Sequence, residues 1–424
     1  MEQNVNKKGS EDFGTIGNNL ADGINTRQMQ FLTRAIDFPA GYTIKYIKDA
    51  NGNPIQSLVN NTMMKVLLNE PLKSGASLNF SIAWSYPITD RSMFMLSREG
   101  YEYFPEDGNT VYLIAHWFPR MAVYNDTEGW QNQQFNRLGE FALEFGDYEV
   151  EITVPEDHIV ASTGQLINAN DVLTKQQLKR MEAAEKSFDK PLLIVTKEEA
   201  EANEKTKSNK LKTWKFNATN VRDFAFASSR KFIWDAQVVK QKTKDVMAMS
   251  FYPKEGNPLW ERYSTRVVVQ TLKTYSKHTF DYPYPVAISV HTDRIGMEYP
   301  MICFNGGRPE ADGTYSKRTK YGLIGVVTHE VGHNFFPMII NSDERQWTWM
   351  DEGLNTFTQY LTQQKWETNY PGRGSVKGIV DYMGGDQENI TPIMTSSLSL
   401  YNFGANAYAK PTAGLLILRE TILG

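Results

Sequence analysis

Two different hydrophobic patterns divide the chain. From about residue 40 to 250, apolar and polar residues alternate in short runs that end at turn residues, as in antiparallel strands. The clearest runs are 44–49, 64–67, 78–84 and 147–155. After residue 254 the apolar positions take a helical spacing, beginning with Trp260, Tyr263, Val267, Val268, Leu272 and Tyr275. We therefore predict an α+β protein whose domain boundary lies near residue 254.

One stretch interrupts the strand pattern. Residues 173–212 are rich in Lys, Glu, Ala and Gln and have few aromatic residues. Because the charges in this stretch are mixed in sign, an exposed lobe is a better explanation than a binding surface. We predict a solvated insertion that is helical in part.

Composition and charge narrow the class of protein. The 424 residues, 41% of them hydrophobic, suffice for two or three domains with their own cores. A net charge of −4 predicts no binding to nucleic acid or to an anionic membrane. The single cysteine, Cys303, excludes an intramolecular disulfide and is expected to be a buried structural thiol. We predict no signal peptide and no transmembrane segment in this sequence, and we leave the compartment open.

The strongest chemical signal is a His-Glu-x-x-His motif inside an apolar helical run. His329 and His333 are four residues apart, so on a helix they lie roughly 40° apart on one face. Both imidazoles can therefore reach one metal ion. Glu330 lies beside them, where it can contact a water molecule on that ion.

Zinc in a catalytic site usually takes three protein ligands and keeps one position for water. A second apolar segment, 347–357, contains Glu352, and 18 residues separate it from His333. That distance allows the first helix to end, the chain to turn and a second helix to return antiparallel. We predict one zinc ion per chain, bound by His329, His333 and Glu352. The alternative is a buried polar cluster without a metal.

This spacing closely resembles that of the gluzincin metallopeptidases of the aminopeptidase N type. Two further motifs agree in order and position. Gly296-Met297-Glu298-Tyr-Pro precedes His329 and is similar to the Gly-x-Met-Glu-Asn signature with which the exopeptidases of this family hold the free amino terminus of a substrate. Tyr408-Ala-Lys, 56 residues after Glu352, is similar to the segment that carries the family's transition-state tyrosine.

The resemblance has consequences for the fold and the ends of the chain. It implies a β-saddle domain over residues 1–254 and a thermolysin-like mixed α/β catalytic domain over residues 255–424. It also implies further strands before the first residue and a helical carboxy-terminal domain after the last, so we expect a chain truncated at both ends. Relatives are often exported.

The resemblance also implies an activity and residue roles. The expected reaction is zinc-dependent removal of amino-terminal residues from peptides. Glu330 would act first as base and then as acid, and Tyr408 would stabilise the oxyanion. Glu298, with Gly296 and Met297, would bind the free amino terminus of the peptide. An endopeptidase or an epoxide-hydrolysing relative with the same metal set, or a catalytically silent peptide-binding fragment, are the alternatives.

Three positions depart from the family pattern. Tyr299 replaces an asparagine after Glu298, Asp351 replaces an asparagine before Glu352, and Gln359 stands where many members have an acidic residue. We expect Asp351 to cap a helix rather than to serve the metal site. For Glu298, whose neighbours are apolar, a salt bridge to Arg294 or Arg308 is the alternative to binding a substrate.

Overall fold

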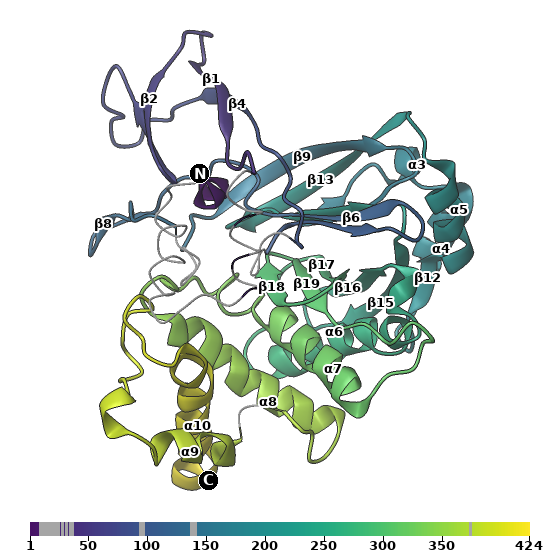
Figure 1. Cartoon of the computed structure of the whole chain (residues 1–424), viewed down its shortest axis with the longest axis vertical. Coiled ribbons are helices and arrows are strands. Elements are labelled where there is room, and N and C mark those ends of the chain that lie inside the picture. Colours follow the sequence, from purple (N-terminus) through teal and green to yellow (C-terminus); the bar gives the residue numbers. More distant parts are fainter. Residues whose placement is uncertain are drawn as a thin grey trace. The chain divides into compact units, whose positions relative to one another are not determined.

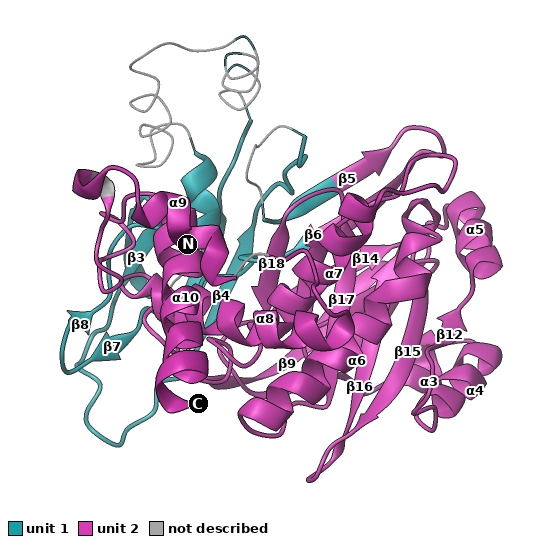
Figure 2. Ribbon diagram, turned by 90° about the horizontal axis from the view of Figure 1, so that it is seen from below, with its two compact units in different colours: residues 1–101, 114–137 teal, residues 102–113, 138–424 magenta. Residues whose placement is uncertain are grey.

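The computed structural model describes residues 1–7, 38–92, 98–135, 142–372 and 375–424, together with the isolated positions 26, 29 and 33. Strands and helices both contribute extensively, which confirms the predicted α+β class. The chain forms two compact units, one of residues 1–101 and 114–137, the other of residues 102–113 and 138–424 (Figure 2). The domain boundary near residue 254 stays a prediction; the division between these units falls elsewhere.

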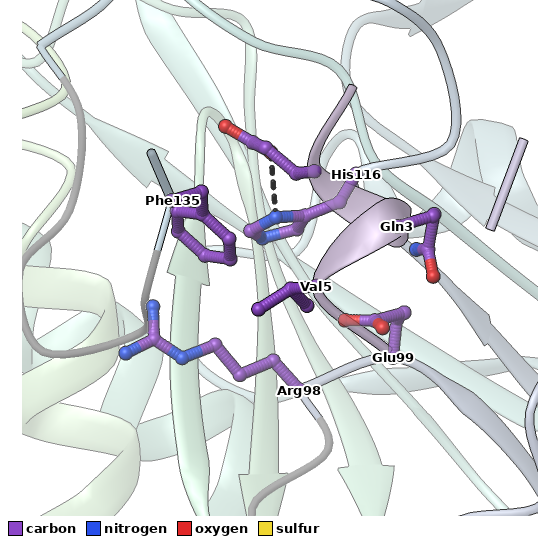
Figure 3. Close-up of a pocket in the computed structure, with 7 residues that line it drawn as sticks. Gln3, Val5, Arg98, Glu99, His116 and Phe135 are labelled. Carbon is purple, nitrogen blue, oxygen red and sulfur yellow. Dashed lines mark ion pairs between the residues drawn. The ribbon is translucent and has the colours of Figure 1, made fainter. Parts of the chain in front are cut away.

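The first unit consists of short strand pairs. Two hairpin-like pairs and one longer antiparallel pair are present: β1 (Thr43–Asp49) with β4 (Phe80–Ser85), β2 (Gln56–Asn60) with β3 (Met63–Leu67), and β7 (Tyr124–Asn125) with β8 (Gly129–Trp130). A 3₁₀ helix, η1 (Glu2–Asn6), is buried. Figure 3 shows a small pocket of this unit, in which Glu2 pairs with His116 at 2.7 Å. The predicted strand runs 44–49, 64–67 and 78–84 therefore correspond to observed strands.

Three sheets involve the second unit. One has the strand order β10 (Ile159–Ser162), β14 (Phe226–Ser229), β6 (Asn109–Ile114), β5 (Gly100–Phe104), and another the order β11 (Gln165–Leu166), β13 (Leu211–Val221), β9 (Gly146–Pro155). The third is a mixed six-stranded sheet of order β12 (Leu192–Val195), β15 (Ile233–Lys240), β16 (Asp245–Tyr252), β17 (Val286–Thr292), β19 (Ile302–Gly306), β18 (Gly296–Tyr299). It takes strands from both sides of residue 254. Its parallel pairs are β16–β17 and β17–β19, and β17 is buried along its whole length, as expected for a central strand.

Helices pack against this six-stranded sheet. The principal helices are α6 (Leu259–His278), α7 (Lys317–Gly332), α8 (Leu354–Trp366) and α10 (Lys410–Ile417). Helix α6 contacts β15, β16 and β17, whereas α7 contacts β18 and β19, and α6, α7 and α8 also contact one another (Figure 1). The apolar positions predicted for α6 are buried, except that Tyr263 is half-buried. The shorter elements after α8 are η4 (Val376–Ile379), α9 (Val380–Met383), η5 (Gln387–Asn389), the π-helical turn η6 (Gly404–Ala409) and a final turn η7 (Leu418–Leu423).

The charged insertion is more integrated than we predicted. The short helix α3 (Ala169–Val172) precedes it, and its own helices are α4 (Lys175–Ala184) and α5 (Lys197–Thr206), each of which begins with a capping box at a threonine. Between them, β12 pairs antiparallel with β15 and so forms one edge of the six-stranded sheet. The short run Leu-Leu-Ile-Val supplies the apolar residues that a strand needs, within a segment whose average composition is polar. No helix among the described residues is long and apolar enough to cross a membrane.

Candidate metal centre

Helix α7 places two of the predicted ligands. The Ser316 hydroxyl accepts the Thr319 N–H at 3.0 Å and caps its first turn. Leu323, Val327 and Val331 are fully buried and fix the rotation of the helix about its axis. His329 therefore lies on the last turn of α7, and His333 is the first residue after it. The α-helix ends at Gly332.

The third predicted ligand comes from the following helical segment. Glu352 belongs to the π-helical turn η3 (Trp349–Gly353), which leads directly into α8. Its Oε2 atom lies 3.0 Å from Nε2 of His329 and 3.2 Å from Nε2 of His333, and the two Nε2 atoms are 3.1 Å apart. The three side chains thus point one atom each at a common centre.

This triangle fits a zinc ion. Ligands held about 2.0–2.1 Å from a tetrahedral ion are separated by roughly 3.3 Å, close to the three observed distances. His333 is only 1% exposed, whereas His329 and Glu352 are 15% and 14% exposed. One side of the triangle is therefore open to a water molecule or a substrate, as a catalytic site requires.

Both imidazoles have acceptors on the ring nitrogen that faces away from this centre. Nδ1 of His329 lies 2.9 Å from Oε1 of Gln359. Nδ1 of His333 donates to the Phe336 carbonyl oxygen at 2.9 Å and lies 2.8 Å from Oδ1 of Asp351. An Nδ1–H bond of this kind leaves the Nε2 lone pair available to a metal. Our expectation for Asp351 is wrong: it makes no capping bond, because the π-helical turn continues into α8 without a capping side chain and directs this carboxylate to His333.

Glu330 lies between the histidines and the edge strand β18. It is 5% exposed, and one of its carboxyl oxygens lies within 4.8 Å of a carboxyl oxygen of Glu298. A Cβ atom on Gly296 would lie 2.0 Å from Oε1 of Glu330, so only glycine allows the strand to approach this carboxyl group so closely. Burial, and next the charge of Glu298, raise the pKa of Glu330 well above its usual value.

The proposed substrate-binding motif forms the whole of β18, the last strand at this edge of the sheet. Met297 and Glu298 are both 5% exposed. Arg294 pairs with Asp293, and Arg308 makes two hydrogen bonds to Glu102. The partners proposed for Glu298 in the alternative reading are thus engaged with other carboxylates.

Tyr408 reaches the site from η6. Its hydroxyl donates to Oε1 of Glu352 at 2.6 Å, and its ring stacks on the His329 ring with centroids 5.7 Å apart. Burial, and then the adjacent Glu352 carboxylate, raise the pKa of Tyr408, so the hydroxyl remains a donor. Burial opposes the ionisation of Glu352, but the neighbouring His333 and His329 outweigh it and lower its pKa.

Several residues around the site were not found by sequence reasoning. Arg222 pairs with the buried Glu344, a loop residue that no local pattern marks. Asn355 donates to the carbonyl oxygen of His329 at 2.8 Å and accepts from the hydroxyl of Tyr275 at 2.6 Å. Asn355 follows Glu352 by three residues, a helical spacing that could have identified it.

The remaining histidines and the cysteine have other environments. Among the described residues, His116, His158, His278 and His291 belong to no group of side chains arranged like metal ligands. The Cys303 thiol is buried and donates to the Glu330 carbonyl oxygen at 3.1 Å. Burial raises the pKa of this thiol well above its ordinary value, which agrees with the predicted structural role.

Comparison with solved structures shows which fold this is. The chain resembles an M1 zinc metallopeptidase from Deinococcus radiodurans, with a TM-score of 0.57 and 15% identity over 89% of this chain and 73% of that one. A variant of that protein bound to a Tyr-Ser-Ala substrate gives a TM-score of 0.54 with 16% identity over the same shares of the two chains. Legionella pneumophila aminopeptidase A, in complex with aspartic acid, gives 0.55 with 13% identity over 90% of this chain and 39% of that one.

Comparison of the sequence alone gives no match. No protein-family model matches the chain, and no curated protein matches it. At 13–16% identity, the likeness to the solved structures establishes a shared fold.

Proposed function

We propose that this chain is a zinc-dependent peptidase that removes residues from the amino terminus of peptides. The observation that carries the proposal is the convergence of one atom each from His329, His333 and Glu352 at 3.0–3.2 Å, on a fold shared with zinc metallopeptidases. The open side of this triangle and the adjacent Glu330 and Tyr408 supply the remaining parts of a hydrolytic site.

A zinc ion bound by these three residues would supply Lewis acidity that lowers the pKa of a water molecule toward about 7. Glu330 takes the proton of the attacking water and passes it to the leaving amine. Burial raises the pKa of Glu330 above that of an ordinary carboxyl group, which makes it a stronger base toward the proton of the water. The Tyr408 hydroxyl donates a hydrogen bond to the oxygen that becomes negatively charged during attack.

The substrate's amino terminus would lie against β18. Glu298 is a buried carboxyl group at the edge of the sheet beside Glu330, and an α-ammonium group would give it a counter-ion. Such an ion pair fixes the first peptide bond over the metal ligands. A peptide with a blocked amino terminus lacks this interaction, which makes the reaction an exopeptidase reaction.

The test separates metal binding from chemistry. Zinc-loaded protein should contain about one zinc ion per chain by elemental analysis. Glu330→Gln should retain the metal but reduce kcat by several orders of magnitude, because the general base is lost while the three ligands remain. Glu310→Gln, an exposed glutamate, is the matched control and should change neither quantity. Folded protein that retains no zinc, or a Glu330→Gln variant with parental kcat, would sink the proposal.

The choice between exopeptidase and endopeptidase rests on Glu298. In Glu298→Ala, kcat/KM for a free peptide should fall by roughly 30-fold to several thousand-fold, the equivalent of about 2–5 kcal/mol for a buried charge pair. The acetylated form of the same peptide is the control substrate. If the parent protein cleaves the acetylated peptide internally as fast as it trims the free one, the endopeptidase alternative replaces the aminopeptidase proposal.

A further inference from the structure

The two histidines of the candidate centre are supported unequally. His333 has a carboxylate, Asp351, and a backbone carbonyl next to its Nδ1 atom, whereas His329 has only a neutral acceptor, the side-chain amide of Gln359. His329 is also the more exposed of the two, at 15% against 1%. The ligand at the open side of the site therefore depends on the weaker acceptor.

His329 has a choice of tautomer, and two of its neighbours favour the one that cannot bind a metal. Its Nε2 atom lies 3.0 Å from the Glu352 carboxylate, which could accept a proton held there. The Asn355 amide nitrogen lies 3.3 Å from Nδ1 and could donate to it only if Nδ1 carried no proton. Both neighbours favour a proton on Nε2, where it would block metal binding.

The orientation of the Gln359 side-chain amide determines which tautomer His329 adopts. Its Nε2 atom donates to the Gly325 carbonyl oxygen at 2.9 Å, one turn before His329 on α7. The other end of the same amide, the oxygen Oε1, then faces Nδ1 of His329 at 2.9 Å. Turning the amide over would place its oxygen against the Gly325 carbonyl oxygen, and two acceptors would meet. The Asn355 amide already donates to the His329 carbonyl oxygen at 2.8 Å, so it does not depend on Nδ1.

We propose that Gln359 is the positioning residue that keeps the proton of His329 on Nδ1 and so holds its Nε2 lone pair toward the metal. The Gly325 carbonyl oxygen orients the Gln359 amide, and the amide in turn sets the tautomer of His329, one turn further along α7. The inference rests on the proposed zinc site but not on the identity of the substrate, and it is tested by metal binding rather than by peptide hydrolysis.

Removing the acceptor should weaken zinc binding. Gln359→Met keeps the length of the side chain but offers no oxygen to Nδ1–H. Its zinc Kd, measured by competition with a chelator, should rise roughly 10- to 100-fold, as is usual when a partner of a ligating histidine is removed. Gln359→Glu restores an acceptor oxygen for Nδ1–H but turns its other oxygen toward the Gly325 carbonyl oxygen, so its Kd should lie clearly below that of Gln359→Met without necessarily reaching that of the parent.

A matched control lies one turn further along the same helix. Gln363 on α8 is buried, at 2% exposure, whereas Gln359 is half-buried, so Gln363→Met is the same substitution at a more enclosed position of the same helix. It should leave the zinc Kd within roughly threefold of the parent. Parental affinity in Gln359→Met, an equal loss in Gln363→Met, or a Gln359→Glu variant that binds zinc no more tightly than Gln359→Met would each overturn the proposal.

A spectroscopic measurement keeps the proposal testable if Gln359→Met folds poorly. The chain has six histidines, so ¹⁵N-histidine labelling of the zinc-loaded parent gives a spectrum simple enough to assign with His329→Gln and His333→Gln. The Nδ1–H proton of His329 should be shifted downfield and exchange slowly with solvent. A rapidly exchanging Nδ1–H, or a proton on Nε2, would show that Gln359 does not hold it. Zinc binding with these signatures but no peptide hydrolysis would refute the proposed function and leave this inference standing.

Discussion

Among the described residues, the larger unit contains four groups of three ligand-type side chains, and two of these groups balance their negative charge in different ways. His329, His333 and Glu352 form one, and Asp107, Glu204 and Glu255 form the other; in both, one ligand atom from each residue lies within 4.8 Å of the others. In the second group a fully buried lysine, Lys231, reaches all three carboxylates, at 2.9 Å from Glu204 and from Glu255 and in direct contact with Asp107. The first group has no lysine or arginine among its described ion pairs.

The difference between the two groups shows that a cluster of ligand-type side chains indicates a metal site only where the chain supplies no counter-ion of its own. Buried carboxylates need a compensating charge, and in the second group the chain itself provides it through Lys231 and, at the margin, Lys254. That cluster is a structural ion pair that also holds helix α5 of the insertion, through Glu204. In the first group, under the proposed function, a zinc ion would supply the compensating charge and would enter through the partly open face.

The largest expected effect is loss of a ligand from the candidate centre. Glu352→Ala should raise the zinc Kd by at least roughly a thousandfold, because a protein zinc site gains about 10–16 kcal/mol from only four ligands. His278→Gln, at the exposed end of α6, is the control and should bind zinc like the parent. Competition with a chelator gives both constants, and near-parental binding by Glu352→Ala would show that the triangle is not the metal site.

The next effect concerns the lysine-filled cluster. Lys231→Ala should lower the free energy of unfolding by about 3–5 kcal/mol, because the buried Glu204 and the half-buried Asp107 and Glu255 lose their principal counter-ion. The exposed Lys205→Ala on α5 should cost little. Millimolar Ca²⁺ or Mn²⁺ should recover part of the loss in Lys231→Ala, since oxygen ligands suit these ions, and should not stabilise the parent. A parent stabilised equally by Ca²⁺ would erase the distinction between the two groups.

The buried carboxyl group of Asp235 offers a third case for the comparison, because its partners are hydroxyl groups rather than a lysine. Asp235 on β15 accepts hydrogen bonds from the hydroxyls of Tyr252, at 2.7 Å, and Thr265. Burial raises its pKa to about 7, against the opposing effect of these bonds. Glu261 raises that pKa further, and Arg266 lowers it. In this case a proton bound by Asp235 neutralises the carboxylate, so no counter-ion is needed.

This predicts how stability depends on pH. Because the pKa of Asp235 is higher in the folded than in the unfolded chain, its contribution is fully present below about pH 4 and is lost as the pH rises through about 7. Between these pH values the parent should lose roughly 2–4 kcal/mol of unfolding free energy through Asp235. Asp235→Asn should not show this loss when the unfolding free energy is measured by urea denaturation at each pH. The exposed Asp245→Asn is the control; identical pH profiles for the Asp235→Asn and parent proteins would contradict the assignment.

The smallest expected effect tests the packing of the general base. Gly296→Ala places a methyl group against Oε1 of Glu330, and the carboxyl group must move. We expect kcat to fall roughly 10- to 100-fold with zinc content unchanged, since a displacement of about 1 Å has effects of this size. Gly322→Ala, on α7 with open space around it, should preserve activity and gain a little stability. Parental kcat in Gly296→Ala would mean that Glu330 adjusts freely.

The sequence by itself determined the α+β class, the amphipathic helix α6, several strands and the three converging ligands. These features are local or depend on one short count of residues. A 3.6-residue period places His329 and His333 on one face, and 18 residues allow Glu352 to return to it. The likeness to solved metallopeptidases agrees with the fold that the motifs implied.

Only the tertiary structure decided the surroundings of these ligands. That Asp351 faces His333, that Gln359 bridges Gly325 and His329, and that Lys231 fills the second acidic group depend on contacts between residues 18 to 124 positions apart. A sequence pattern records which side chains share a face of one element, but not which atoms meet when three helices and a sheet edge pack together. These tertiary contacts determine which group neutralises each buried acid, and they therefore determine the chemistry of the site.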